Sequence, residues 1–286
     1  MAQARVVDVA LAPKAASAQP QRKADEVVGA DEPSTAAGAL ERDGWVVLGG
    51  QASSHDATVE RARAVIEVVD DPLSGLGSLG LIADYALPPP GAKDRAFQVL
   101  HFDFGLPLGT VPATDVARYT ALWVSSDCPV ASAATRLVRL AGLGRRRRWP
   151  PSDQVIARLV ERRSEQEPSE GILARIVEAA DRTTELPDKE HPEFLCGLEF
   201  DSLSAERRFF ARHHLDLHSS EQLVALSPGE ILIFDNLACA HGRMGSRRTH
   251  ELRQVCFGFA GLGAEPQRRV LSHSLEALVS ADADGL

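Results

Sequence analysis

Two short stretches of the sequence carry residue types that could together hold a metal ion. The first is the run 97–104, in which an imidazole and a carboxylate, His101 and Asp103, are separated by one residue. Because successive side chains of a strand point to opposite faces, these two polar groups share one face. The second is the run 226–243, in which a Pro-Gly turn launches an apolar strand, Asp235-Asn236 ends it, and His241 follows. A second imidazole can therefore approach the first pair from a neighbouring strand.

Two histidines and one carboxylate on one side of an iron ion leave three positions open, which is the facial arrangement of non-haem Fe(II) oxygenases. Each piece has an ordinary explanation when taken alone. Among nine histidines, about one chance match of His with an acidic residue two positions on is expected. His241 alone is more often a turn histidine bonded to backbone. The joint pattern favours a metal centre, with zinc in a hydrolase or isomerase as the rival.

Arg253 is the third residue of interest, twelve positions beyond His241. In the predicted strand 252–259 it shares a face with Val255, Phe257 and Phe259. A guanidinium on an apolar face is costly to bury unless an anion meets it there. The far carboxylate of 2-oxoglutarate would suit, because its planar oxygens match the guanidinium fork. The alternative is an edge strand on which Arg253 faces water and the other alternation is buried.

In this order and spacing, the motifs resemble the taurine dioxygenase, clavaminate synthase and γ-butyrobetaine hydroxylase superfamily. The resemblance spans roughly residues 40–262, although only the two motif regions are specific. It implies Fe(II) held by His101, Asp103 and His241, with 2-oxoglutarate as co-substrate and dioxygen as oxidant. It also implies a salt bridge from Arg253, and a hydrogen bond from Thr120, to the far carboxylate of the co-substrate.

The chain departs from the family pattern at one position. Many relatives place a second arginine four residues beyond the first, where this chain has Phe257. Arg243 or Arg248 could therefore contribute to binding the co-substrate instead.

The implied activity is hydroxylation of an unactivated C–H bond, with release of succinate and CO2. The expected substrate is a small polar metabolite, such as an amino acid derivative in specialised biosynthesis, and this expectation rests on family analogy alone. Desaturation, cyclisation or epoxidation remain open as outcomes. Halogenation is disfavoured, because relatives that halogenate replace the carboxylate that Asp103 supplies. A metal-binding sensor or structural barrel is the non-enzymatic alternative.

The elements that must position these residues are short strands bounded by Gly, Pro or Asp. The runs 44–48, 97–102, 118–125, 229–236 and 252–261 predict strands, and 57–69 shows helical spacing. Helical periodicity at 134–143, 153–163 and 169–180 predicts a helical insertion over about 131–182. The segment Arg207–His214, before the distal motif, is where relatives place a mobile lid or a substrate-facing strand.

Strands, then helices, then strands predict one mainly β domain over residues 37–286, with a double-stranded β-helix core of the jelly-roll or cupin-like type flanked by helices. Residues 1–36, rich in Ala, Pro, Gln and Ser, predict a flexible N-terminal segment.

Composition excludes several classes of partner. The net charge of −9 argues against binding to nucleic acid or to an anionic membrane, and no apolar stretch approaches the roughly 20 residues that cross a bilayer. The four cysteines lie far apart without C-x-x-C spacing, and no secretory leader precedes them. The expectation is therefore a reduced, cytoplasmic protein that acts on a small molecule, with an oligomeric state that the sequence does not indicate.

Overall fold

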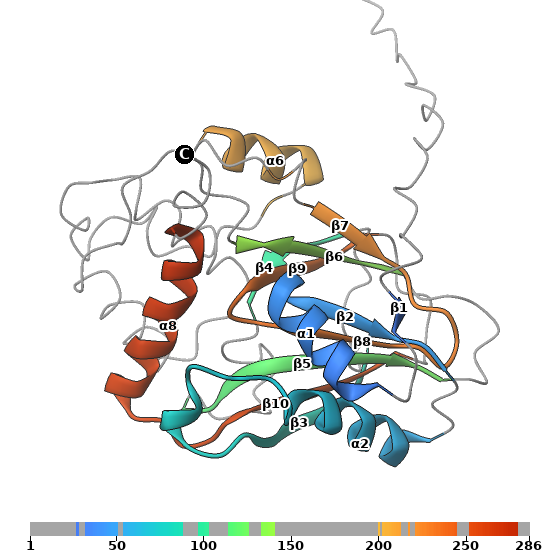
Figure 1. Ribbon diagram of the computed structural model, residues 1–286. Coiled ribbons are helices and arrows are strands. Elements are labelled where there is room, and N and C mark those ends of the chain that lie inside the picture. The colour runs from blue at the N-terminus through green and yellow to red at the C-terminus, as the bar shows by residue number, and fades with distance from the viewer. Residues whose placement is uncertain are drawn as a thin grey trace, which may run out of the picture.

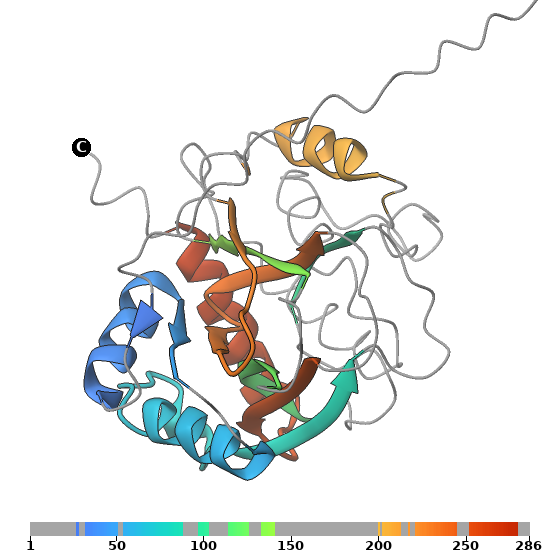
Figure 2. The same ribbon diagram turned by 90° about the vertical axis from the view of Figure 1, so that its right-hand side faces the viewer.

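The computed structural model of the chain describes residues 27–28, 32–50, 54–87, 97–102, 114–125, 133–140, 200, 202–212, 217, 221–244 and 252–279 (Figure 1). Within this part of the chain, two β-sheets lie one above the other, as Figures 1 and 2 show. The described residues are mainly β, as the sequence predicts.

The larger sheet has six strands, and all of its pairings are antiparallel except β1 with β2. Its strands alternate between early and late parts of the sequence, which brings the predicted distal strands beside the early ones. In spatial order they are β1 (Val27–Val28), β2 (Trp45–Leu48), β8 (Ile231–Asp235), β5 (Val116–Val124), β10 (Leu252–Phe259) and β3 (Gly80–Leu87).

The smaller sheet has four antiparallel strands and carries both histidines of the predicted metal site. His101 is the last residue of β4, and His241 lies on the adjacent strand β9. In spatial order the strands are β4 (Phe97–His101), β9 (Cys239–Met244), β6 (Ala134–Arg139) and β7 (Glu221–Val224).

In the described ranges, four α-helices and one short 3-10 helix surround the sheets, and two of these α-helices have clear stop or start signals. Gly44 ends the first helix in a left-handed conformation at φ 78°, which glycine adopts without a Cβ penalty. The Ser54 side chain accepts a hydrogen bond from the Ala57 N–H and caps the second. The helices are α1 (Pro33–Asp43), α2 (His55–Ile66), η2 (Ser74–Leu76), α6 (Leu203–Arg212) and α8 (Ala264–Val279).

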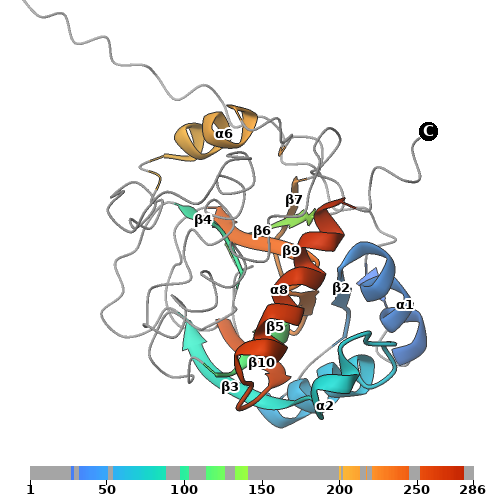
Figure 3. The same cartoon turned by 90° about the vertical axis from the view of Figure 1, so that its left-hand side faces the viewer.

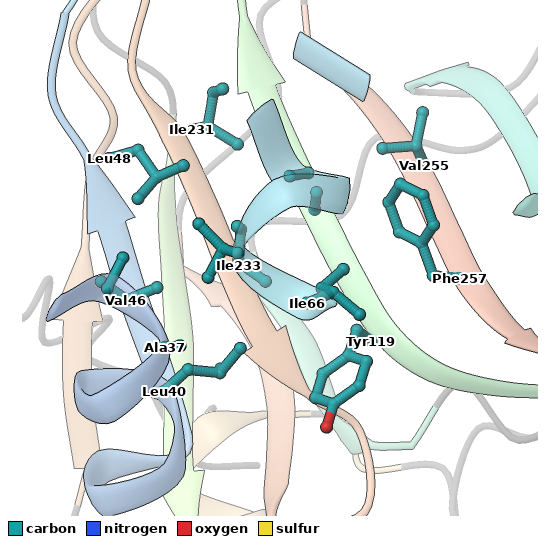
Figure 4. Packing of buried hydrophobic residues seen from close by; sticks show 14 of the residues in the cluster. Ala37, Leu40, Val46, Leu48, Ile66, Tyr119, Ile231, Ile233, Val255 and Phe257 are labelled. Atoms are coloured by element: carbon teal, nitrogen blue, oxygen red, sulfur yellow. The ribbon is translucent and has the colours of Figure 1, made fainter. Parts of the chain in front are cut away.

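Two apolar layers lie on the two faces of the larger sheet. On the outer face, α1 and α2 cover side chains such as Ile233, Tyr119 and Val255 (Figure 4). On the inner face, side chains of the larger sheet such as Leu232 and Phe234 pack against Leu137 of the smaller sheet. Figure 3 shows α8 running across one end of both sheets. The inner face of the larger sheet is therefore the one that faces the two histidines of the smaller sheet.

Three sequence predictions change in the structure. Residues 134–139, predicted as helix, form strand β6, because they pair with β9 on one side and β7 on the other. The fold begins before residue 37, since β1 pairs with β2 and Pro33 opens helix α1 at a position where its missing N–H costs nothing. In the segment before the distal motif, residues 207–212 belong to helix α6 and do not form a strand, whereas residues 213–214 lie outside the described residues and a lid role stays a prediction.

The remaining predicted strands and the helix at 57–69 are confirmed within a few residues. The rest of the predicted helical insertion, and residues 1–26, lie outside the described residues. In the part of the chain that is described, no helix is long and apolar enough to cross a membrane.

Candidate metal centre

The centre of the site is a pair of buried imidazoles from β4 and β9. His101 and His241 are direct partners across the two strands, with ring centres 4.2 Å apart, and their exposed fractions are 2% and 6%. An ion about 2.1 Å from one nitrogen of each ring, with the two bonds at a right angle, would place the ring centres about 4.6 Å apart. The observed separation therefore fits two ligands of one metal ion.

Hydrogen bonds select which nitrogen of His101 can bind a metal. The Nδ1 atom lies 2.8 Å from the carbonyl oxygen of Val99, which can only accept a proton. A ring that donates from Nδ1 carries its lone pair on Nε2. The Gln98 amide nitrogen lies 3.4 Å from that Nε2 atom and marks the side on which an electrophile would sit. This carbonyl contact is of the kind that orients metal-binding histidines.

Strand β4 reaches this geometry through a bulge between Gln98 and His101, where the pairing with β9 shifts. The neighbouring residue on β9 is Gly242, and a Cβ there would lie 2.7 Å from the Gln98 carbonyl oxygen and 3.0 Å from that of Val99. The glycine beside His241 therefore has a packing role, because only a residue without a side chain lets β9 approach the bulge this closely.

The third predicted ligand, Asp103, lies outside the described residues. Among the residues that are described, no three His, Cys, Asp or Glu side chains form a group that could hold a metal. The structure thus brings His101 and His241 together, and the role of Asp103 stays a prediction.

Thr120 lies on the inner face close to this pair. Its strand partner is Phe234, whose ring centre is 4.6 Å from that of His241. The Thr120 hydroxyl accepts a hydrogen bond from the Asn236 amide at 2.7 Å and lies 3.6 Å from the Cys256 sulfur. A hydroxyl, an amide and a thiol therefore line the sheet beside the histidines, and the contact of Thr120 with a co-substrate stays a prediction.

Arg253 does not join this group. As predicted, it shares a face of β10 with Val255 and Phe257, but that face is the outer one, which packs against α2. Its guanidinium forms an ion pair with Asp84 on β3 at 3.0 Å, and its side chain is 40% exposed. His55 binds the other oxygen of the same carboxylate at 2.8 Å. The anion that the sequence requires for Arg253 is thus supplied by Asp84, and binding of a co-substrate by Arg253 stays a prediction.

Arg243 shares a face of β9 with His241. It lies two residues further along β9, in unbroken register with β6, and is half-buried. Its strand partners are Thr135 on β6 and Gln98 on β4. Arg248, the other alternative, lies outside the described residues. The positively charged Arg243 therefore lies on the same strand and the same face as His241, two residues further along.

Sequence reasoning missed the ionic cluster behind β4. Arg136 on β6 is fully buried and pairs with Glu206 of α6 at 2.7 Å and with Glu221 of β7. Arg207 closes the cluster by binding Glu221 at 2.9 Å. Burial raises the pKa of the Glu206 carboxyl, while the Arg136 guanidinium and the Leu100 N–H act in the opposite direction. A charged residue inside a predicted helix gave no signal that it would pair with carboxylates 70 and more residues away in sequence.

A second buried ionic cluster fixes the turn before β9. Arg118 binds Asp71 at 3.1 Å and Asp235 at 2.6 Å, and the Asp235 carboxylate also accepts the Leu237 N–H at 2.7 Å. The Asn236 N–H donates to the Arg118 carbonyl oxygen. These contacts hold the chain between β8 and His241 in one conformation.

No protein-family model and no curated protein matches the sequence. Several solved structures resemble the fold at low identity. One is PvcB of Pseudomonas aeruginosa, an Fe and α-ketoglutarate dependent oxygenase from an isonitrile synthetic pathway (17% identity, 82% of this chain and 81% of that chain, TM-score 0.38). Others are a taurine dioxygenase from Burkholderia xenovorans (14%, 80% and 81%, TM-score 0.39) and asparagine oxygenase (16%, 79% and 77%, TM-score 0.35).

Proposed function

We propose that the chain is a non-haem Fe(II) oxygenase that uses 2-oxoglutarate as co-substrate and hydroxylates a small polar metabolite. The observation that carries the proposal is the buried pair His101 and His241, in register on adjacent strands, with a carboxylate two residues after the first. Asp103 completes the facial set in this proposal. Neutral imidazoles and one carboxylate suit Fe(II) and leave room for co-substrate and oxygen.

The order of the strands supports a double-stranded β-helix as the scaffold. From the third strand on, the larger sheet contains β8, β5, β10 and β3, and the smaller sheet contains β4, β9, β6 and β7. Consecutive strands thus tend to alternate between two facing sheets, as a jelly roll requires. Such a fold places the end of β4 beside β9 inside the sandwich, which is where His101 and His241 lie.

The chain's own residues would do three things at this centre. The Val99 carbonyl keeps the proton of His101 on Nδ1, so that Nε2 faces the ion. Phe234 covers the ring of His241 and helps to exclude water. The Thr120 hydroxyl, fixed by Asn236, offers a hydrogen bond to a bound carboxylate. When bound, Fe(II) with 2-oxoglutarate and dioxygen supplies the oxidation that converts a C–H bond to an alcohol, with release of succinate and CO2.

Two arginines compete for the far carboxylate of the co-substrate. Arg253 is the one that the family resemblance implies, but it is paired with Asp84 on the outer face. Arg243 lies on the same face as His241, and the geometry favours it. Arg243→Ala should raise the 2-oxoglutarate concentration for half-saturation at least about tenfold, the size of one charge-assisted bond. The same loss in Arg253→Ala alone would instead support the sequence prediction.

The experiment that tests the function is anaerobic absorption spectroscopy of metal-free protein after addition of Fe(II) and then 2-oxoglutarate. The proposal expects a weak visible charge-transfer band that needs both additions and is lost in His101→Ala and His241→Ala. Release of succinate in air, stimulated by candidate metabolites, would then identify the substrate. Bound iron without such a band would contradict the proposal.

A zinc-dependent hydrolase is the rival enzyme, and a structural metal site is the non-enzymatic one. Both would show metal-dependent thermal stability without oxygen consumption. Succinate formation separates them from the oxygenase, because neither a hydrolase nor a structural site consumes 2-oxoglutarate. Hydroxylation rather than desaturation or cyclisation, a cytoplasmic location and a small-molecule partner belong to the same proposal.

A further inference from the structure

Helix α6 forms a polar contact with β4, the strand that carries His101. The N–H of Leu100, in the bulge of β4, donates a 2.6 Å hydrogen bond to the Glu206 carboxylate. The two residues are 106 positions apart in sequence, and the Glu206 side chain is fully buried. The carboxylate thus accepts a hydrogen bond from an N–H in the stretch where the hydrogen-bond ladder between β4 and β9 is interrupted.

The same bulge sets the orientation of His101. Its Val99 carbonyl binds the ring at Nδ1, and its Gln98 carbonyl oxygen accepts a 3.3 Å hydrogen bond from Arg136. Arg136 in turn pairs with Glu206. The Gln98 carbonyl of the bulge is therefore bound by the arginine of an ion pair, and the Val99 carbonyl binds the imidazole.

We propose that Glu206 is a positioning residue of the metal centre, which fixes the β4 bulge and through it the ring of His101. This inference rests on the proposed function, because it assumes that His101 binds a metal. Outer contacts of this kind change metal affinity by about 10- to 100-fold when they are removed. Glu206 touches no reacting atom, and its effect passes through the Leu100 peptide.

Glu221 provides the matched control. It is also a buried carboxylate, 5% exposed, and it also pairs with Arg136. Its other described contact is Arg207 on α6, and none of its described contacts reaches β4. Removal of Glu221 or Glu206 breaks the same ionic cluster, but only removal of Glu206 leaves the Leu100 N–H without its acceptor.

The test uses Glu206→Ala, Glu206→Gln and Glu221→Ala beside the wild type, each titrated anaerobically with Co(II). The readouts are the Co(II) dissociation constant, the visible Co(II) spectrum, and urea unfolding of the metal-free protein. Both alanine variants should unfold at lower urea. Glu206→Ala should bind Co(II) about 10- to 100-fold more weakly with an altered spectrum. Glu221→Ala should stay within about threefold of the wild type, and Glu206→Gln, which keeps an acceptor oxygen, should keep the wild-type spectrum.

A double variant covers the case in which Glu206→Ala does not fold. In Arg136→Met with Glu206→Met, both charges are removed together, so no unpaired charge is left buried, and such replacements are often neutral. The Leu100 N–H still loses its acceptor, so Co(II) binding should still weaken. Wild-type affinity and spectrum in Glu206→Ala, or in the double variant where Glu206→Ala does not fold, would overturn the inference alone. Wild-type protein that binds no Co(II) would overturn the proposed function and this inference with it.

Discussion

Substitution of Gly242 by alanine is a direct perturbation of the contact between β9 and the β4 bulge. The added Cβ would lie 2.7 Å from one carbonyl oxygen of β4, closer than real Cβ contacts allow, and 3.0 Å from a second, tighter than most real contacts. Both are backbone atoms, so no flexible side chain can move aside. Separating the strands by several tenths of an ångström is an overpacking strain of about 1–3 kcal/mol. Alanine is better than glycine in a strand by about 0.5–1 kcal/mol. The net loss in the free energy of unfolding is therefore about 0–2.5 kcal/mol.

Gly38 supplies the control with the opposite sign. It lies inside helix α1, it is exposed, and a Cβ there would meet nothing within 4 Å. Gly38→Ala should therefore stabilise the protein by about 0.5–1 kcal/mol through helix propensity. Urea unfolding followed by tryptophan fluorescence measures both variants under the same conditions.

The two variants also differ in what they should do to the metal site. Gly242→Ala pushes against the carbonyl of Val99, which orients His101, so Co(II) should bind more weakly. Gly38→Ala should leave Co(II) binding unchanged. A Gly242→Ala protein that is as stable as Gly38→Ala, and binds Co(II) like the wild type, would refute the close approach of β9 to the bulge.

Three further predictions concern the outer face and the buried ionisable groups. Asp84→Ala and Arg253→Ala should each lower the free energy of unfolding by no more than about 1 kcal/mol, measured by urea unfolding, because their ion pair is partly exposed. Burial raises the pKa of the Tyr119 phenol and of the Cys239 thiol. The folded chain then keeps protons that the unfolded chain releases, so stability should fall as pH rises from about 8 to 11 in urea titrations. The Cys239 thiol, which is fully buried, should react with a maleimide at pH 8 only after unfolding, and mass spectrometry of the labelled peptide would reveal any faster reaction.

Much of the larger sheet could be predicted from sequence, because its strands are short apolar runs with clear boundaries. Strand β6 could not, and the reason is Arg136. An arginine among apolar residues looks like the solvent side of an amphipathic helix, but here its charge is neutralised by Glu206 and Glu221. Those carboxylates lie far away in sequence, so the period of the local pattern carries no trace of them. Helix α6 escaped recognition for a related reason, because its contacts with the smaller sheet pass through Glu206, which binds Arg136 of β6 and the Leu100 N–H of β4, both far away in sequence.

The residues of the site also divide into those that could be predicted from sequence and those that could not. His101 and His241 could be paired from sequence, because each lies at or shortly after the end of a predicted apolar strand. The case of Arg253 marks the limit. A period of two states which residues of β10 share a face, and that prediction is correct for Arg253, Val255 and Phe257. It does not state whether helices or the second sheet cover that face, and this choice decides whether the guanidinium meets Asp84 or a ligand.

The contacts around the bulge connect the stability of the sandwich to the chemistry of the site. The Val99 carbonyl that fixes the His101 ring belongs to the same peptide segment that Gly242 packs against and that Glu206 holds. Each of these groups constrains where the Nε2 lone pair of His101 points. In the proposed metal site, the geometry would therefore be set by backbone atoms of β4, and the buried charges on α6 and β6 would stabilise the backbone conformation that presents His101 to His241.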